Sequence, residues 1–100
     1  MLKNFENLGD FMKIFYSANI AWQDYFETIY IFNEQSRDTF LLEGTARQIW
    51  LTIETNNDIK NIVDLLSNIY NVGAEVIERD CIELLNEMKE NGLIDIYETT

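Results

Sequence analysis

The pattern of the chain changes character at Gly44, and this change limits the folds that are open to it. Before Gly44, short β-branched and aromatic runs alternate with polar residues, which is typical of strands and turns. After it, apolar residues recur every three or four positions in three successive segments, which predicts amphipathic helices. The 100 residues contain no proline and suffice for one domain with a modest core. We therefore expect an α+β fold.

Three strands are predicted in the first half of the chain. The first covers 20–26, and the second, 28–32, is β-branched or aromatic throughout. After the polar turn 33–38, Thr39–Leu42 forms the third, so the spacing predicts a three-stranded antiparallel meander. Residues 1–18 fit neither period, and we treat them as an N-terminal arm: either a short helix and a strand, or an arm that packs on a neighbouring molecule. The folded domain is expected over 19–97.

Three helices are predicted in the second half, over 45–53, 58–70 and 75–90, each with one apolar stripe. Residues 94–97 alternate, and they form either a last strand or a tail. Strands first and then three linked helices predict a small architecture of the winged-helix type. The residues expected in the helical stripes are Ala46, Ile49, Trp50, Ile53, Ile59, Ile62, Val63, Leu66, Ile69, Tyr70, Ile77, Cys81, Leu84, Leu85 and Met88.

The ends of these helices also have sequence signals. Thr45 and Asn57 are the expected N-caps of the first two helices. Gly73 is expected to stop the second helix with a positive φ, and Gly92 to end the third in a Schellman motif with Leu93 as its hydrophobic contact.

Composition excludes several classes of function. The chain has no histidine and a single cysteine, so the commonest general base, an internal disulfide and a cysteine-cluster zinc site are all missing. Cys81 is expected to be a small buried hydrophobe. Seven basic and eighteen acidic residues give a net charge of −11, which opposes nucleic-acid binding. We find no signal peptide and no apolar run long enough for a membrane span, and we expect a cytoplasmic domain without a cofactor.

The ordered set of elements resembles a known family. The stretch 19–94 is similar to a PqqD-like domain, also called a RiPP recognition element, which captures the leader of a ribosomally made precursor peptide. Glu43 stands where the family commonly has asparagine, and the N-terminal segment is longer than the family minimum. The segments that carry the resemblance are Asn19-Ile20-Ala21-Trp22, Ile29-Tyr30-Ile31-Phe32-Asn33, Phe40-Leu41-Leu42-Glu43-Gly44-Thr45-Ala46, Ile49-Trp50, the helix from Ile62 to Tyr70, Asp80 with Leu84, Leu85 and Met88, and Asn91-Gly92-Leu93-Ile94.

The resemblance implies a non-catalytic module that presents a precursor leader to a modifying enzyme or a leader peptidase. It implies that the leader adds as a strand to the third strand and that its side chains enter a pocket beside the third helix. Main-chain hydrogen bonds of Phe40 and Leu41 would hold the leader. The strand residues so implicated are Thr39, Phe40, Leu41 and Leu42.

The third helix has a flank that suits this use. At about 100° per residue, one side of its core stripe is acidic with an apolar margin. Such a groove suits a leader with one or two large apolar anchors and nearby Lys or Arg. Replacement of Asp80 and Glu87 by Lys should then weaken a basic leader. The residues on this flank are Val76, Asp80, Glu83, Leu84 and Glu87.

Plainer interpretations stay open for the same residues. Phe40 and Leu42 fit a sheet core, and the acidic flank fits a solvated helix face. A winged-helix regulator would need cations on its third helix, which carries mainly acids. An enzyme would need a cavity, a metal cluster or an activated nucleophile, and the sequence shows none of these. An assembly domain whose edge strand pairs with its own copy is the third alternative, and a homodimer is compatible with leader binding.

Overall fold

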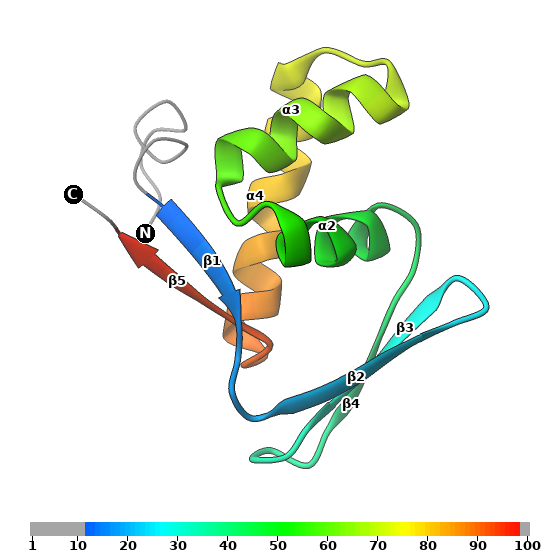
Figure 1. Ribbon diagram of the computed structural model, residues 1–100, viewed down its shortest axis with the longest axis vertical. Helices are drawn as coiled ribbons and strands as arrows, with labels where there is room; N and C mark the ends of the chain where they lie inside the picture. The colour runs from blue at the N-terminus through cyan, green and yellow to red at the C-terminus, as the bar shows by residue number, and fades with distance from the viewer. Residues whose placement is uncertain (1–11, 99–100) are drawn as a thin grey trace.

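The computed structural model describes residues 12–98, in which four strands are followed by three helices and a fifth strand (Figure 1). The expectations for residues 1–11 fall outside these described residues. The elements in chain order are β1 (Met12–Tyr16), β2 (Ile20–Tyr25), β3 (Thr28–Asn33), β4 (Thr39–Leu42), α2 (Gly44–Thr55), α3 (Ile59–Tyr70), α4 (Ala74–Glu90) and β5 (Ile94–Glu98).

The predicted meander is confirmed. β2, β3 and β4 form a three-stranded antiparallel sheet in that order. Along β3, Ile29 and Ile31 are buried, whereas Tyr30 and Phe32 are exposed, so one face covers the core and the other faces solvent. This alternation places Phe40 and Leu42 of β4 on the inner face.

A second sheet corrects the predicted order of three strands followed by three helices. β1 pairs antiparallel with β5, and Ile14 lies opposite Ile96. Ile14 and Ile94 are buried, while Phe15 and Tyr97 make an edge-to-face contact on the exposed side. A strand from the N-terminal arm thus precedes the meander, and 94–97 is a strand rather than a tail. The α+β class with one three-stranded sheet and three helices is confirmed, and the winged-helix comparison stays a prediction.

Two expected N-caps are wrong. α2 begins after Glu43 rather than at Thr45, and α3 is preceded by Asp58 rather than capped by Asn57. At α3 the reason is a contact with a distant strand, because Asp58 pairs with Lys13 of β1, while the backbone carbonyl of Asn57 accepts from the amide of Ile14. The polar groups of residues 57 and 58 therefore bind β1 instead of capping α3.

Of the two predicted helix C-termini, the one at α3 is wrong and the one at α4 is confirmed. Asn71, with φ 54°, takes the left-handed conformation that ends α3, whereas Gly73 has φ −61° and precedes α4. Asparagine tolerates this region better than most residues, because its side chain is short and polar. At the end of α4 the Schellman motif is confirmed: Gly92 has φ 74°, and the Leu93 amide donates to the Met88 carbonyl at 2.9 Å.

The core lies where the helices meet the inner faces of both sheets. Most predicted stripe positions are buried, including Trp50 and Cys81, which are both 0 % exposed. Ile69 and Tyr70 were expected in the stripe of α3 and are instead exposed in its last turn. Tyr16, Trp22 and Trp50 form an aromatic cluster with ring centroids 4.5–5.8 Å apart.

A buried asparagine joins the meander to the end of α4. Asn33 is 5 % exposed, and its Nδ2 donates to the carbonyl oxygens of Asn91 and Gly92 at 3.2 and 3.3 Å. Its Oδ1 accepts from the amides of Gln35 and Ser36 in the β3–β4 turn. A Cβ on Gly92 would lie 2.8 Å from this Nδ2, so only glycine fits there. This contact positions β4 beside the second half of α4.

Candidate functional site

A groove of about 370 Å³ runs between β4, the start of α2 and the second half of α4. Seven of its ten lining residues are apolar, and two more are the carboxylates Glu43 and Glu87, with no lysine or arginine among them. The groove is therefore suited to apolar side chains that come with positive charge nearby. The lining residues are Phe40, Leu41, Leu42, Glu43, Ala46, Leu84, Glu87, Met88, Asn91 and Leu93.

β4 is an edge strand with an open side. Among residues 12–98 its only strand partner is β3. The Asn33 amide donates to the Asp38 carbonyl, and this pair continues the β3–β4 register. In an antiparallel ladder such hydrogen-bonded pairs alternate. Phe40 and Leu42 therefore direct their backbone groups to β3, whereas Thr39 and Leu41 present theirs to the open edge.

This alternation corrects one expectation. The backbone of Phe40 is used within the sheet, so, within residues 12–98, it is Thr39 and Leu41 whose main-chain groups no strand occupies. The side chains divide in the opposite way: Phe40 and Leu42 turn inward and line the groove, and Leu41 is 59 % exposed. Edge and groove thus offer a peptide both main-chain partners and a place for its side chains.

The structure brings together some of the residues singled out in the sequence. Phe40, Leu41, Leu42, Leu84 and Glu87 all line the groove. The remaining four do not line it: Thr39 lies at the start of β4 and is exposed, and the others are exposed positions of α4 nearer its N-terminus. Those three α4 residues are Val76, Asp80 and Glu83.

Five lining residues were missed by sequence reasoning. Met88 and Leu93 had been assigned to the core and to the helix end, and they serve as groove wall as well. Glu43, Ala46 and Asn91 come from segments adjoining the predicted ones. The signal that could have found them is their direct continuation of β4 and α4 in the chain, since a groove between two elements also uses their flanking turns.

Glu43 connects the groove with the β2–β3 hairpin. Its carboxylate accepts from the Thr28 hydroxyl at 3.1 Å. Close by, the guanidinium of Arg47 donates to both carboxylate oxygens of Asp24 at 3.0 and 2.6 Å. These hydrogen bonds hold the pKa of Asp24 below its usual range. The start of α2 is thereby fixed against the sheet on one side of the groove.

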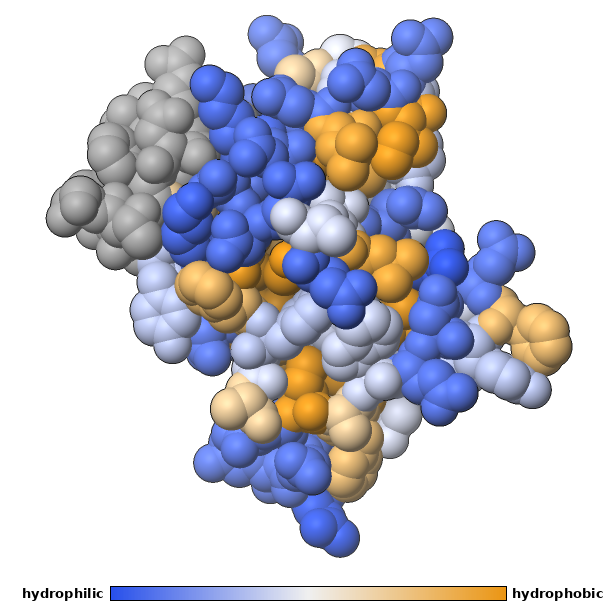
Figure 2. Space-filling view, in the orientation of Figure 1, coloured by the Kyte–Doolittle hydropathy of each residue, from blue (hydrophilic) through white to orange (hydrophobic). Residues whose placement is uncertain are grey.

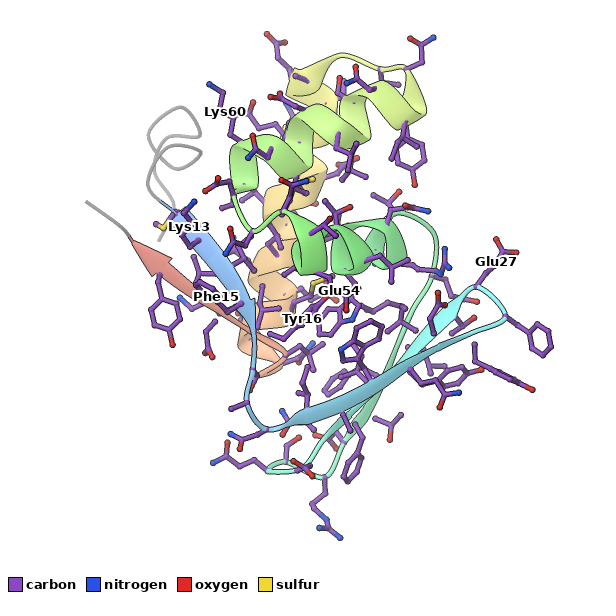
Figure 3. All side chains as sticks on the ribbon, in the orientation of Figure 1. Lys13, Phe15, Tyr16, Glu27, Glu54 and Lys60 are labelled. Carbon is purple, nitrogen blue, oxygen red and sulfur yellow. The ribbon has the colours of Figure 1, made fainter. Side chains whose placement is uncertain are left out.

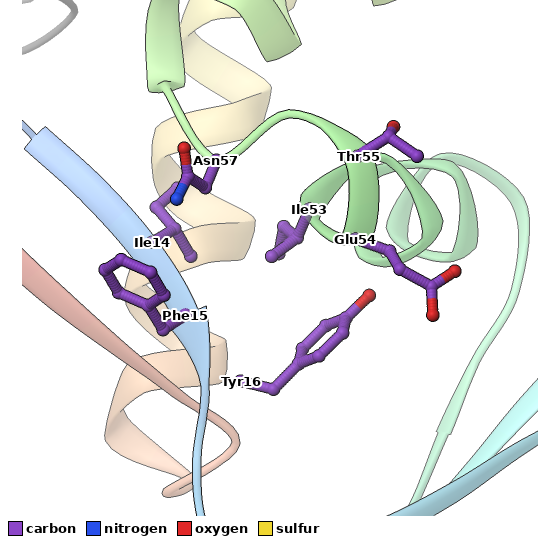
Figure 4. Close-up of a pocket in the computed structure, with 7 residues that line it drawn as sticks. All are labelled: Ile14, Phe15, Tyr16, Ile53, Glu54, Thr55 and Asn57. Carbon is purple, nitrogen blue, oxygen red and sulfur yellow. The ribbon is translucent and has the colours of Figure 1, made fainter.

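A second cavity, of about 430 Å³, lies between β1 and the end of α2 (Figure 4). Tyr16 reaches from β1 towards α2 and its hydroxyl donates to the Trp50 carbonyl. Burial, and next the negative charge of Glu54, raise the pKa of Tyr16 far above its usual range. The phenol therefore stays protonated and engaged, which suits packing better than acid–base chemistry.

Residues 12–98 offer few other groups that could bind a metal ion or act as a nucleophile. Residues 12–98 contain no group of three or more metal-binding side chains that could hold an ion. Burial, and next the charge of Asp80, raise the pKa of the Cys81 thiol to about 12, so it is an inert thiol at neutral pH. None of the helices described is both long and apolar enough to cross a bilayer.

Comparison with known proteins adds a family and a fold. Residues 29–94 match the family described as coenzyme PQQ synthesis protein D, PqqD. One similar solved structure is described as TbiB1 in complex with the TbiA(beta) leader peptide; it has a TM-score of 0.76 and 21 % identity, over 80 % of this chain and 93 % of that one.

A second solved structure is described as lasso peptide synthetase B1 complexed with the leader peptide. Its TM-score is 0.75 at 20 % identity, over 83 % of this chain and 98 % of that one. At such identities the likeness concerns the fold, and no curated protein gives a significant match. Because the family match covers β3, β4, all three helices and the start of β5, this chain belongs to the PqqD family.

Proposed function

We propose that this domain captures the leader segment of a ribosomally made precursor peptide and presents it to a modifying enzyme or a leader peptidase. The observation that carries the proposal is the open edge of β4 beside the apolar groove. An extended peptide would add to β4 as a fourth strand of the meander, paired with Thr39 and Leu41. The family supports this use, and the two similar structures were both solved with a leader peptide.

The groove also limits the sequence of the peptide. Alternate side chains of an added strand point to one face. One or two large apolar side chains would enter between Phe40 and Leu84, and Lys or Arg beside them would approach Glu43 and Glu87. The exposed flank of α4, with Val76, Asp80 and Glu83, would contact a peptide that continues past the groove. Such capture needs no cofactor and no chemistry by the domain itself, and it takes place in the cytoplasm, where precursor peptides are made.

A titration of the purified domain with the leader of a precursor encoded beside its gene tests the proposal. We expect a dissociation constant in the sub-micromolar to low-micromolar range. A dissociation constant of about 1 µM corresponds to a binding free energy of about −8 kcal/mol. Calorimetry is preferred, because Trp22 lies on β2, the far strand of the sheet, and no tryptophan lines the groove. Absence of binding to every such leader would overturn the proposal.

The same open edge favours a second candidate, pairing of β4 with β4 of another copy. Size-exclusion chromatography with light scattering distinguishes the two. A dimer that a leader peptide dissociates shows that both use the β4 edge. A dimer that persists while the peptide is bound shows assembly through another surface and excludes pairing of β4 with β4.

A further inference from the structure

The β2–β3 hairpin ends in a turn that is unfavourable for its residues. Tyr25 pairs with Thr28, so the loop has two residues, and both have positive φ: 49° at Phe26 and 64° at Glu27. Two positive φ values define a type I′ turn, for which Asn-Gly is strongly preferred. Phenylalanine and glutamate meet a steric penalty in this region. The chain therefore holds two residues in a conformation that a common dipeptide would adopt without strain.

The fold itself gains little from this turn. Phe26 is 83 % exposed, and its ring makes an edge-to-face contact with that of the neighbouring Tyr25, with centroids 4.4 Å apart. Figure 1 shows the hairpin projecting away from the helices, and in Figure 2 its end forms a hydrophobic tip beside hydrophilic neighbours. Strain that yields no packing is a reason to look for a function at the strained residues.

The tip is held firmly in place. Two residues before Phe26, Asp24 is clamped by Arg47, and two residues after it, Thr28 donates to Glu43. Both partners belong to the start of α2, so the hairpin is fixed to the helical layer on each side of its turn. A projecting aromatic on a rigid support is pre-organised for insertion, because little conformational freedom is lost on binding.

A hollow next to the tip enlarges the surface. Gln23, Tyr25 and Tyr30 line a depression of about 390 Å³ on the outer face of the sheet, and Leu41 lies beside Tyr30 in the register. Tyr30 is 43 % exposed. Aromatic residues are enriched at protein interfaces, where they supply most of the binding energy. The projecting Phe26 and this depression together form what we call the hairpin surface: Gln23, Tyr25, Phe26 and Tyr30.

The charge around the hairpin surface selects the partner. Glu27 stands exposed at the tip (Figure 3), and Arg47, whose positive charge it senses, is already paired with Asp24. The whole chain carries −11. A second copy or an anionic lipid surface would be repelled, whereas a protein pocket bordered by Lys or Arg would be attracted.

We propose that the hairpin surface docks the enzyme that processes the captured peptide, by inserting Phe26 into an apolar pocket with a cationic rim. The identity of this partner rests on the function proposed above. The surface lies on the outer face of the sheet, and the peptide groove lies on the inner face beside α4. One domain can therefore hold leader and enzyme at the same time.

The test exchanges the turn for its preferred dipeptide in the double variant Phe26→Asn/Glu27→Gly. Relief of strain should raise the melting temperature by roughly 4–8 °C. Affinity for the leader should stay within about twofold, while affinity for the purified enzyme of the same biosynthetic gene cluster, measured on the domain with and without leader, should fall at least about tenfold. Tyr97→Ser removes an exposed aromatic from β5 and should leave both affinities unchanged.

The possible results of this experiment distinguish the docking proposal from its alternatives. Enzyme binding that survives the double variant, or is absent in the natural domain, overturns the docking proposal. A melting temperature that does not rise removes the strain argument on which it depends. If the natural chain is a dimer that the variant splits, the partner is a second copy and the proposal is wrong. If no leader binds but enzyme affinity still depends on the tip, the docking surface stands and the capture function fails.

Discussion

Asn33 shows how one side chain can connect distant parts of the fold. We expect Asn33→Asp to lower the free energy of unfolding by about 2–3 kcal/mol, because a carboxylate cannot donate to the carbonyls of Asn91 and Gly92 and leaves them without a partner. Urea denaturation measures this. Asn91→Ser is the control, since the exposed Asn91 contributes only its backbone carbonyl to the contact. Equal stability of Asn33→Asp and the natural chain would show that the contact is dispensable.

The buried thiol predicts a dependence on alkaline pH. Folding raises the pKa of Cys81 from 9.0 to about 12, so the folded chain keeps a proton that the unfolded chain releases. The free energy of unfolding should therefore fall as pH rises from 9 to 12, by up to about 1.4 kcal/mol per pH unit. Burial also raises the pKa of Tyr16, from 10.0, and adds to the fall above pH 10.

Cys81→Ala separates the two groups. Between pH 9 and 10 the slope due to the thiol should disappear in this variant, although its stability at pH 7 is lower because of the cavity. Denaturation series at pH 7, 9 and 10 give the comparison. A variant with the slope of the natural chain would mean that other groups cause it.

At the level of elements, local periodicity was a good guide and long-range pairing was not. The three helices and the meander follow from spacings within a few residues, so they could be predicted. β1 could not be assigned, because its pattern is dense and its partner β5 lies about 80 residues further on. The expected cap at Asn57 failed for a similar reason, since the salt bridge between Lys13 and Asp58 joins elements that are adjacent only after folding.

The candidate site was predictable to the same extent. The resemblance identified β4 and α4, and five of the nine residues line the groove. The sequence did not indicate which part of α4 lines the groove. The α4 residues that line the groove are Leu84, Glu87 and Met88, and Val76 lies outside it.

The open edge of β4 gives a sharp test of strand addition. The amide of Leu41 points away from β3, so Leu41→Pro should spare the sheet, where proline is tolerated on edges. A peptide that pairs with this amide should lose at least about tenfold in affinity relative to Leu41→Ala, which removes the side chain but keeps the N–H. Circular dichroism checks the fold and calorimetry the affinity. Equal binding by the two variants would exclude pairing at Leu41.

At the scale of the whole molecule, charge is the dominant property. Reversal of Glu87 to Lys should weaken a leader that carries Lys or Arg by about two- to tenfold, in line with a partly exposed ion pair. The loss should shrink at high salt. Asp64→Lys, an exposed site on α3 away from the groove, makes the same change in net charge and should have little effect.

Asp80→Lys then measures how far the peptide extends along α4. An effect equal to that of Glu87→Lys would show that the leader covers the exposed flank, as the sequence suggested. An effect equal to that of Asp64→Lys would confine the leader to the groove. Titrations of the three variants with one peptide at two salt concentrations give the answer.

The pairing of β1 with β5 places Met12 directly opposite Glu98. A domain whose entry and exit points are neighbours can be spliced into a surface loop of a host protein without being stretched. The edge strand β4 belongs to the other sheet, so its open side would stay accessible in such a graft. The same architecture can thus serve as a separate adaptor or as a cassette inside a larger enzyme, and a short linker from 98 to 12 would allow new ends to be opened elsewhere.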